Sequence, residues 1–174
     1  MHHRLIFVLG LVAACTACSP PQGQAVIPPA SAATAAPAPA AGTADAPISK
    51  GPVYLSDLLR HRNFASAFAA LLAADQLPDW PAQGGTSAPA QHVVVNGHPL
   101  WLVAACKPHD CPSERLLLLY DESTHAMSGV FARRKSGVAN DVDSNDEAND
   151  ELIWLGAPDE AAKQLLRGKL YSSE

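Results

Sequence analysis

The stretch from residue 91 to residue 134, QHVVVNGHPLWLVAACKPHDCPSERLLLLYDESTHAMSGVFARR, decides the fold. It contains four short apolar runs, at 91–95, 100–105, 115–120 and 127–133, and polar residues separate each run from the next. Between the first two runs, Asn96-Gly97 is a strong hairpin signal, because both residue types tolerate the positive φ of a tight turn. Successive strands joined by such turns predict an antiparallel meander.

Helical patterns lie on the N-terminal side of this stretch. Ser56-Asp57 can begin a short helical turn, and Asn63 is a candidate N-cap for a longer helix. The longer helix should end near Asp75, because prolines follow. Its apolar stripe consists of Phe64, Phe68, Leu71 and Leu72. We expect Trp80, in the loop that follows, to cover the core rather than to bind a ligand.

The C-terminal side adds one more strand and one more helix. Residues 137–151 are acidic and poor in apolar side chains, so they are expected to form an exposed loop. A short strand over 152–155 should place Trp154 inside. Pro158 suits the first turn of a helix that ends at Gly168, with Ala161, Leu165 and Leu166 on one face. The predicted class is therefore α+β.

The N-terminal residues predict export. A continuous apolar run at 5–14 is too short to span a bilayer as a helix and is typical of a signal peptide, here residues 1–14. It ends in Val12-Ala13-Ala14-Cys15, which resembles the bacterial lipobox, so Cys15 is the predicted lipidation site and Cys18 the second candidate. Residues 15–50 are rich in Ala and Pro and predict a lipid-anchored tether. The folded domain is expected over 51–174, in the bacterial periplasm.

The net charge limits the partners. The formal charge is −5 with histidines neutral, which disfavours nucleic acid. Cleavage before Cys15 removes Arg4 and no acidic residue, so 12 − 1 basic residues face 17 acidic ones and the mature charge is −6. A basic partner protein suits this charge better than an acidic one.

Catalytic and metal-binding patterns are weak. Asp141, Asp143 and Asn145 match the first positions of an EF-hand loop, but its glycine position is Asp146 and its glutamate position is Leu152, which favours an acidic surface loop. The sequence has no nucleophile elbow, phosphate-binding loop or metalloprotease motif. We therefore predict that the protein is not an enzyme and has no cofactor or metal.

The segment Cys106-Lys107-Pro108-His109-Asp110-Cys111 is the candidate site. Two thiols and one imidazole could contribute to a zinc site, but structural zinc normally takes a fourth ligand and exported thiols are normally oxidised. A redox pair usually has two residues between its cysteines, not four. As a disulfide, the pair closes a small stiff loop with Lys107, His109 and Asp110 left to project. Such a loop loses little entropy on entering a cleft, which favours a recognition role.

Four ordered motifs resemble the inhibitor of vertebrate lysozyme (Ivy) family. The CKPHDC segment at 106–111 is that family's signature. The flanking LPDW at 77–80, GGTSAPAQ at 84–91 and MSGVF at 127–131 are similar to family segments in the same order. The resemblance covers about residues 55–135. It implies an antiparallel sheet with helices packed on one face, and a disulfide-closed loop that protrudes from it.

The resemblance also implies a mechanism. The loop would enter the active-site cleft of c-type lysozyme, a basic enzyme, and His109 would hydrogen-bond its two catalytic carboxylates. Family members occur as homodimers, so a homodimer is possible here. The lipobox, the tether and the acidic segment depart from the family pattern.

Two other functions are compatible with the sequence. The protein could be an envelope factor that controls the cell's own lytic transglycosylases or binds peptidoglycan, or it could be a small hydrolase.

Overall fold

The computed structural model describes residues 47–48, 51–139 and 145–171. The predicted signal peptide, the candidate lipidation sites Cys15 and Cys18, nearly all of the tether, and Asp141 and Asp143 of the acidic segment lie outside the described residues. All structural statements below concern the folded unit to which the described residues belong.

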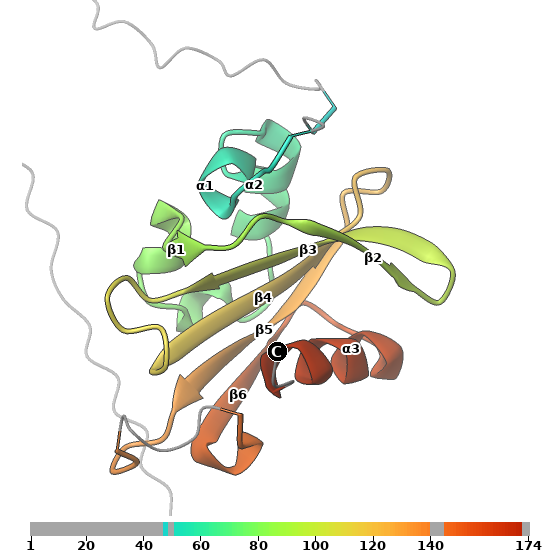
Figure 1. Ribbon diagram of the computed structural model, residues 1–174. Coiled ribbons are helices and arrows are strands. Elements are labelled where there is room, and N and C mark those ends of the chain that lie inside the picture. Colours follow the sequence, from blue (N-terminus) through green and yellow to red (C-terminus); the bar gives the residue numbers. More distant parts are fainter. Residues whose placement is uncertain (1–46, 49–50, 140–144, 172–174) are drawn as a thin grey trace, which may run out of the picture. The chain divides into compact units, whose positions relative to one another are not determined.

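One antiparallel sheet of six strands forms the centre of the domain (Figure 1). Its strands are β1 (Thr86–Ser87), β2 (Gln91–Val95), β3 (His98–Cys106), β4 (Glu114–Tyr120), β5 (Met127–Arg134) and β6 (Asp150–Leu155). The main order is β1-β3-β4-β5-β6, and β2 pairs with β3 beside β1. The predicted meander and the α+β class are confirmed.

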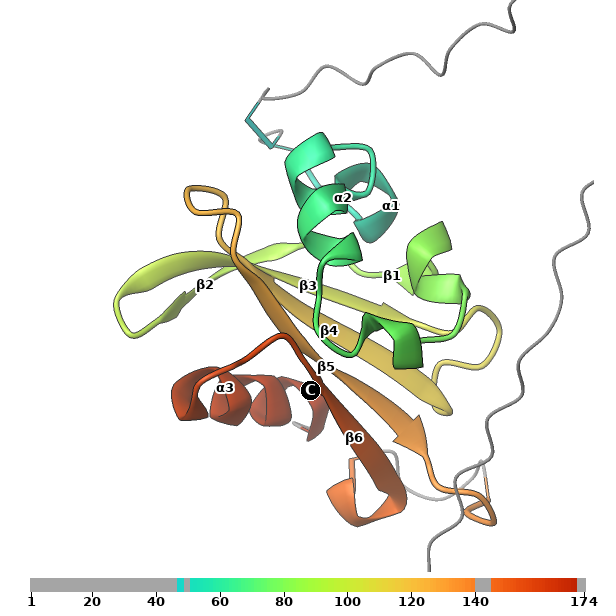
Figure 2. The same cartoon turned by 180° about the vertical axis from the view of Figure 1, so that it is seen from behind.

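Helices cover both faces of the sheet, not one face as the family resemblance implied (Figures 1 and 2). The reason lies in β4, where every residue from Leu116 to Tyr120 is buried. Side chains alternate between faces along a strand, so a continuous buried run requires a core on each side. Leu116, Leu118 and Tyr120 join the core under the N-terminal helices, whereas Leu117 and Leu119 join the core under the C-terminal helix.

The N-terminal helices are shorter than the apolar stripe predicted. They are α1 (Leu55–Leu58) and α2 (Arg62–Ala69), followed by the 3-10 turns η1 (Ala74–Gln76) and η2 (Trp80–Gln83). The N-cap of α2 is His61 rather than Asn63. Leu72, expected on the buried stripe, is 68% exposed. The chain leaves the helical path there because Ala73 has a φ of 66° and the Leu72 carbonyl accepts a hydrogen bond from the Gly156 N–H.

The β2–β3 hairpin has a tighter turn than predicted. Asn96 and Gly97 alone form it, with φ values of 52° and 81°, and Val95 pairs directly with His98. Positive φ at both central residues is the type I′ pattern. Pro99 is tolerated in β3 because pairing with β4 begins only at Trp101, so the missing N–H faces no neighbouring strand on that side.

The C-terminal strand and helix extend beyond their predicted bounds. β6 begins at Asp150, within the segment expected to be exposed, because the Asp150 side chain is buried between two arginines. Helix α3 (Glu160–Tyr171) continues past Gly168, and burial of Leu170 offsets the poor helix propensity of glycine. Its buried face consists of Ala162, Leu166 and Leu170. Within the described residues, none of the helices combines the length and apolarity needed to cross a bilayer.

Candidate functional site: the tip between β3 and β4

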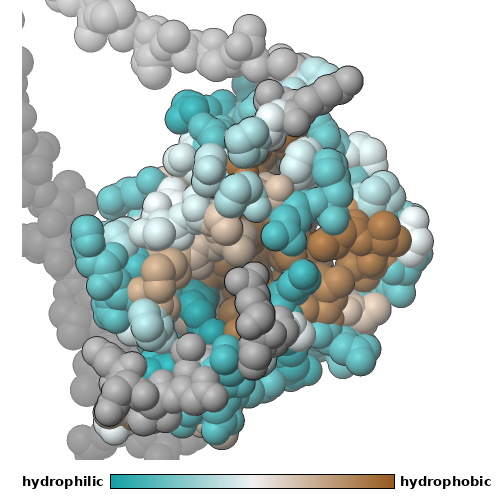
Figure 3. All heavy atoms as spheres, viewed as in Figure 1, coloured by the Kyte–Doolittle hydropathy of each residue, from teal (hydrophilic) through white to brown (hydrophobic). Residues whose placement is uncertain are grey.

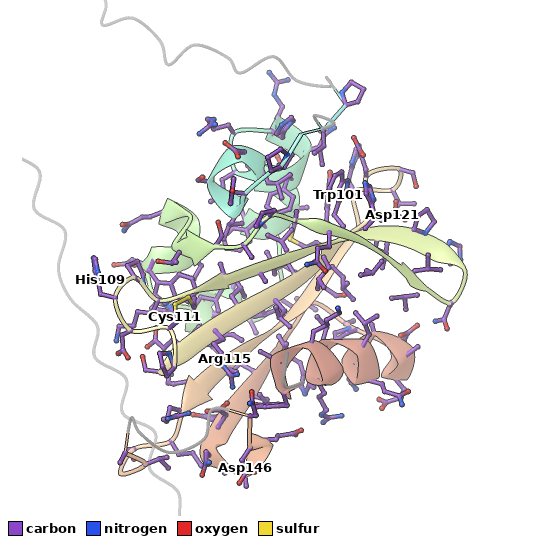
Figure 4. All side chains as sticks on the ribbon, in the orientation of Figure 1. Trp101, His109, Cys111, Arg115, Asp121 and Asp146 are labelled. Atoms are coloured by element: carbon purple, nitrogen blue, oxygen red, sulfur yellow. A yellow bond between two sulfur atoms is a disulfide. The ribbon has the colours of Figure 1, made fainter. Side chains whose placement is uncertain are left out.

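The connection from β3 to β4, residues 107–113, is called the tip. Cys106, the last residue of β3, forms a disulfide with Cys111, which confirms the predicted pairing. The Lys107 N–H donates to the Glu114 carbonyl at 3.0 Å and extends the β3–β4 ladder by one bond. His109 lies at the outer end of the tip and points away from the sheet (Figure 4). The strands therefore hold the base of the tip, and the disulfide closes it.

A tight turn shapes the outer end of the tip. The Asp110 N–H donates to the Lys107 carbonyl at 3.1 Å, which closes a four-residue turn with Pro108 and His109 at its centre. Proline at the second position and positive φ at the third are the type II pattern. His109 occupies that third position with a φ of 63°. This conformation is uncommon for residues other than glycine, and such strain is concentrated at functional sites.

The other polar side chains of the tip bind one another. The Lys107 ammonium lies 3.3 Å from the Asp110 carboxylate, and the Ser113 hydroxyl donates to the same oxygen at 2.6 Å. The hydrogen bond from Ser113 lowers the pKa of Asp110 below its ordinary value, and Lys107 acts in the same direction. The sequence had suggested that Lys107, His109 and Asp110 all project. The structure instead uses Lys107 and Asp110 within the tip.

His109 is thus left as the projecting group. Its side chain is exposed, and no hydrogen bond, ion pair or ring contact involves it within the part of the chain that the structure describes. Pro108 is exposed beside it. An imidazole held in this way can offer two ring nitrogens to one partner.

Residues far from the tip in sequence support its base. Gly85 has a φ of 54°, and a Cβ there would lie 2.6 Å from the Trp80 ring and 2.8 Å from the Cys106 carbonyl oxygen. Only glycine allows Trp80 and Cys106 to approach this closely. The Trp80 indole N–H also donates to the Glu114 carboxylate at 2.6 Å. Trp80 is buried, as predicted for a core lid, and it additionally braces both strands that carry the tip.

Two residues of this assembly, Glu114 and Ser113, were not predicted from the sequence. Their contacts depend on how the strands pair and on the path of the tip, and neither residue belongs to the motifs discussed above. The only available signal was indirect: the glycines of the GGTSAPAQ segment indicated a close backbone approach, but not its partner.

The turn at the opposite end of β4, residues 121–126, contains a second histidine in a similar conformation. His125 has a φ of 59°, and its Nδ1 lies 3.0 Å from the hydroxyl of the buried Tyr120. Burial raises the pKa of Tyr120, and the Glu122 and Asp121 carboxylates add to the rise. Figure 4 places Asp121 at the end of the sheet away from His109. This histidine is exposed, but unlike His109 its ring has a hydrogen-bond partner within the domain.

The rest of the described surface differs from the tip in the side chains that it presents. Among the described residues, no group of three or more His, Cys, Asp or Glu side chains is placed to hold a metal ion. The disulfide removes the two thiolates that a zinc site at the tip would need. Figure 3 shows hydrophilic side chains along the edge that carries the tip. In the same view, hydrophobic side chains gather at the opposite edge, near the β2–β3 hairpin. A hollow of about 520 Å³ lies close to them, at the start of α3.

Comparison with known proteins gives a consistent match. A family model described as inhibitor of vertebrate lysozyme (Ivy) matches residues 63–169, more than half of the chain. The protein named inhibitor of vertebrate lysozyme of Escherichia coli strain K12 is 30% identical over 105 residues, which cover 60% of this chain and 61% of that protein. The match thus spans somewhat less than two thirds of that relative's length.

Two proteins of Pseudomonas aeruginosa strain PAO1 are also similar. One, named inhibitor of vertebrate lysozyme, is 27% identical over 120 residues, covering 68% of this chain and 78% of the relative. The other is uncharacterised and is 30% identical over 97 residues, covering 55% of this chain and 61% of the relative. The family match includes the whole tip and the strands that carry it.

Proposed function

This chain belongs to the inhibitor of vertebrate lysozyme (Ivy) family, and on that premise we propose that it inhibits c-type lysozyme by placing its tip in the active-site cleft. The observation that carries the proposal is the exposed His109 imidazole at the end of a disulfide-closed turn whose other polar groups bind one another. In this role the protein acts as a binding partner and performs no chemistry.

The chemistry of the target explains why one imidazole suffices. Retaining glycosidases such as lysozyme hold two carboxyl groups about 5 Å apart on either side of the bond to be cut. An imidazole has two ring nitrogens that can each take part in a hydrogen bond, so one histidine can contact both groups. The tip would then occupy the position of the sugar, so inhibition should be competitive with substrate.

The rigidity of the tip supports tight binding. Ordering a flexible loop at an interface opposes association, and a loop that is already ordered avoids that cost. Here the disulfide, the Lys107–Asp110 turn and the Ser113 hydroxyl all restrict the tip before any partner binds. The mature charge of −6 inferred from the sequence would also accelerate encounter with a basic enzyme, more strongly at low salt.

A lysozyme titration tests the proposal. The purified protein should abolish the activity of a c-type lysozyme on bacterial cell walls at near-equimolar ratio. A chitotriose competitor, which occupies the same cleft, should weaken the apparent inhibition in proportion to its concentration. Inhibition that chitotriose does not affect would mean that the protein binds outside the cleft, and the tip mechanism would be wrong.

We further propose that the protein is exported and anchored by lipid at Cys15, with residues 15–50 as the tether. The apolar run at 5–14, the Val12–Cys15 motif and the Ala/Pro-rich composition support this arrangement. Metabolic labelling with a palmitate analogue should mark the wild-type protein and not Cys15→Ala. Labelling that survives Cys15→Ala and disappears in Cys18→Ala would move the anchor to the second cysteine.

Sedimentation of the purified protein would test for a homodimer.

A further inference from the structure

Ser113 lies two residues beyond the disulfide ring, yet its side chain and its N–H both contact Asp110 inside the ring. Its N–H donates to the Asp110 carbonyl at 3.1 Å, and its hydroxyl lies 2.6 Å from the Asp110 carboxylate and 3.0 Å from the Asp110 carbonyl. Its own carbonyl accepts the Arg134 N–H of β5 at 2.8 Å. One residue thus connects the outer turn of the tip to a third strand.

The disulfide by itself does not fix the conformation of the residues it encloses. It sets the separation of Cys106 and Cys111, whose Cα atoms lie 4.8 Å apart, but four residues between them can adopt several conformations. His109 holds a left-handed backbone that costs free energy for any residue with a Cβ. Pro108 and the hydrogen bond from the Asp110 N–H to the Lys107 carbonyl favour this conformation, and a further contact that fixes Asp110 would stabilise it.

The Asp110 carboxylate makes such contacts, because it is held from two sides. Lys107 contacts it from the start of the turn and Ser113 from beyond the ring, so the residue next to His109 is fixed in place. Lys107 is at the surface and can exchange its partner for water. Ser113 is anchored on β5 through Arg134 and cannot move away as easily.

We infer that Ser113 is a positioning residue of the tip, which holds His109 in its outward, left-handed conformation through Asp110. The inference rests on the proposed function for its effect on lysozyme. The inference adds Ser113, which is hydrogen-bonded to β5, to the site formed by residues 106–111. Ser113 itself need not contact the enzyme.

The chain offers a matched control at the other end of β4. Ser123 donates its hydroxyl to Asp121 at 2.6 Å, the same distance as from Ser113 to Asp110. Ser113→Ala should weaken lysozyme inhibition about three- to tenfold, the loss expected from one hydrogen bond. Ser123→Ala should leave it within a factor of two. Ser113→Thr retains the hydroxyl and should restore inhibition to near the wild-type value.

A double-mutant cycle tests whether Ser113 acts through His109. In a His109→Asn background, Ser113→Ala should cause no further loss, because the group that it positions is gone. Equal losses in both backgrounds would overturn the positioning role and place Ser113 in direct contact with the enzyme. If Ser113→Ala and Ser123→Ala weakened inhibition equally, the loss would reflect lower overall stability and not the positioning of His109.

A measurement on the free protein separates this inference from the proposed function. The left-handed φ of His109 gives a strong NOE between its own amide and α protons in the NMR spectrum. That NOE should weaken in Ser113→Ala and persist in Ser123→Ala and Ser113→Thr. If the wild type failed to inhibit lysozyme, the proposed function would fail while this comparison still tested Ser113. An unchanged His109 NOE in Ser113→Ala would refute the inference itself.

Discussion

The two ends of β4 carry turns built from the same local parts. At the tip and at the 121–126 turn, a histidine takes a left-handed backbone, with φ values of 63° and 59°. In each turn a serine hydroxyl donates to an aspartate carboxylate at 2.6 Å. In both cases this contact lowers the pKa of the aspartate, and for Asp121 the value falls to about 2.

The two turns differ in what the histidine side chain meets. His125 is hydrogen-bonded to the Tyr120 hydroxyl, and its ring stacks on Tyr120 with centroids 6.3 Å apart. His109 makes no such contact with the described residues, because the disulfide-closed tip carries it away from the sheet. The comparison shows that the turn alone does not make a recognition site. The tip differs from the 121–126 turn in two ways: the disulfide-closed loop carries its histidine outward, and that histidine has no partner among the described residues.

Replacing each histidine in turn with asparagine should give the largest difference in lysozyme inhibition between the two turns. His109→Asn keeps a residue that tolerates the left-handed backbone but removes the imidazole. Truncating one partner of a buried charged pair costs about 2 kcal/mol or more, so lysozyme inhibition should weaken about 30-fold or more. His125→Asn should leave the inhibition constant within a factor of two. Similar losses in the two variants would remove the functional distinction between the turns.

Opening the disulfide should give the next largest effect. The double variant Cys106→Ser/Cys111→Ser retains His109 but loses the covalent closure that the 121–126 turn never had. Loop-closure entropy for a ring this small predicts a loss of stability of about 2 kcal/mol. Inhibition should weaken about tenfold through loss of preorganisation. Urea unfolding and inhibition assays on the same preparations would measure the two effects; full inhibition by the double variant would show that the disulfide is dispensable.

Tyr120→Phe should affect stability alone. It removes the hydroxyl that binds His125 and retains the buried ring, so unfolding free energy should fall by about 1 kcal/mol. The inhibition constant should stay unchanged, because the change lies at the end of β4 away from the tip. A weaker inhibitor with an intact thermal transition would show that the two ends of β4 are coupled.

The pH dependence at Asp121 should give the smallest effect. Because its pKa is lowered in the folded state, the ionised carboxylate stabilises the fold at pH values above its ordinary pKa near 3.8. That stabilisation should disappear as the pH falls through about 2. Asp121→Asn should therefore lose less than about 1 kcal/mol at pH 6, since the group is near the surface. The difference from wild type should shrink steadily in urea unfolding series towards pH 2; a difference independent of pH would mean that charge is not involved.

Local patterns explain how much of the fold could be predicted from the sequence. The four central strands are close to their predicted bounds, because the apolar runs and the Asn96-Gly97 turn act over a few residues. The end of α2, the start of β6 and the length of α3 differ from prediction. Each depends on a distant partner: Gly156 for Leu72, two arginines for Asp150, and the sheet for Leu170.

By itself, the sequence determined the α+β class, the cysteine pair and the residues that place the chain in its family. Alternation and turn chemistry are short-range properties, so they can be deduced without coordinates. Only the tertiary structure decided that both faces of the sheet are covered and that Lys107 and Asp110 bind each other rather than project. It also brought Trp80, Gly85 and Arg134 to the base of the tip. Which side chain of the tip projects depends on the path that the loop takes between its strands, and long-range contacts hold the base of that loop. Neither feature is encoded in a hydrophobic periodicity.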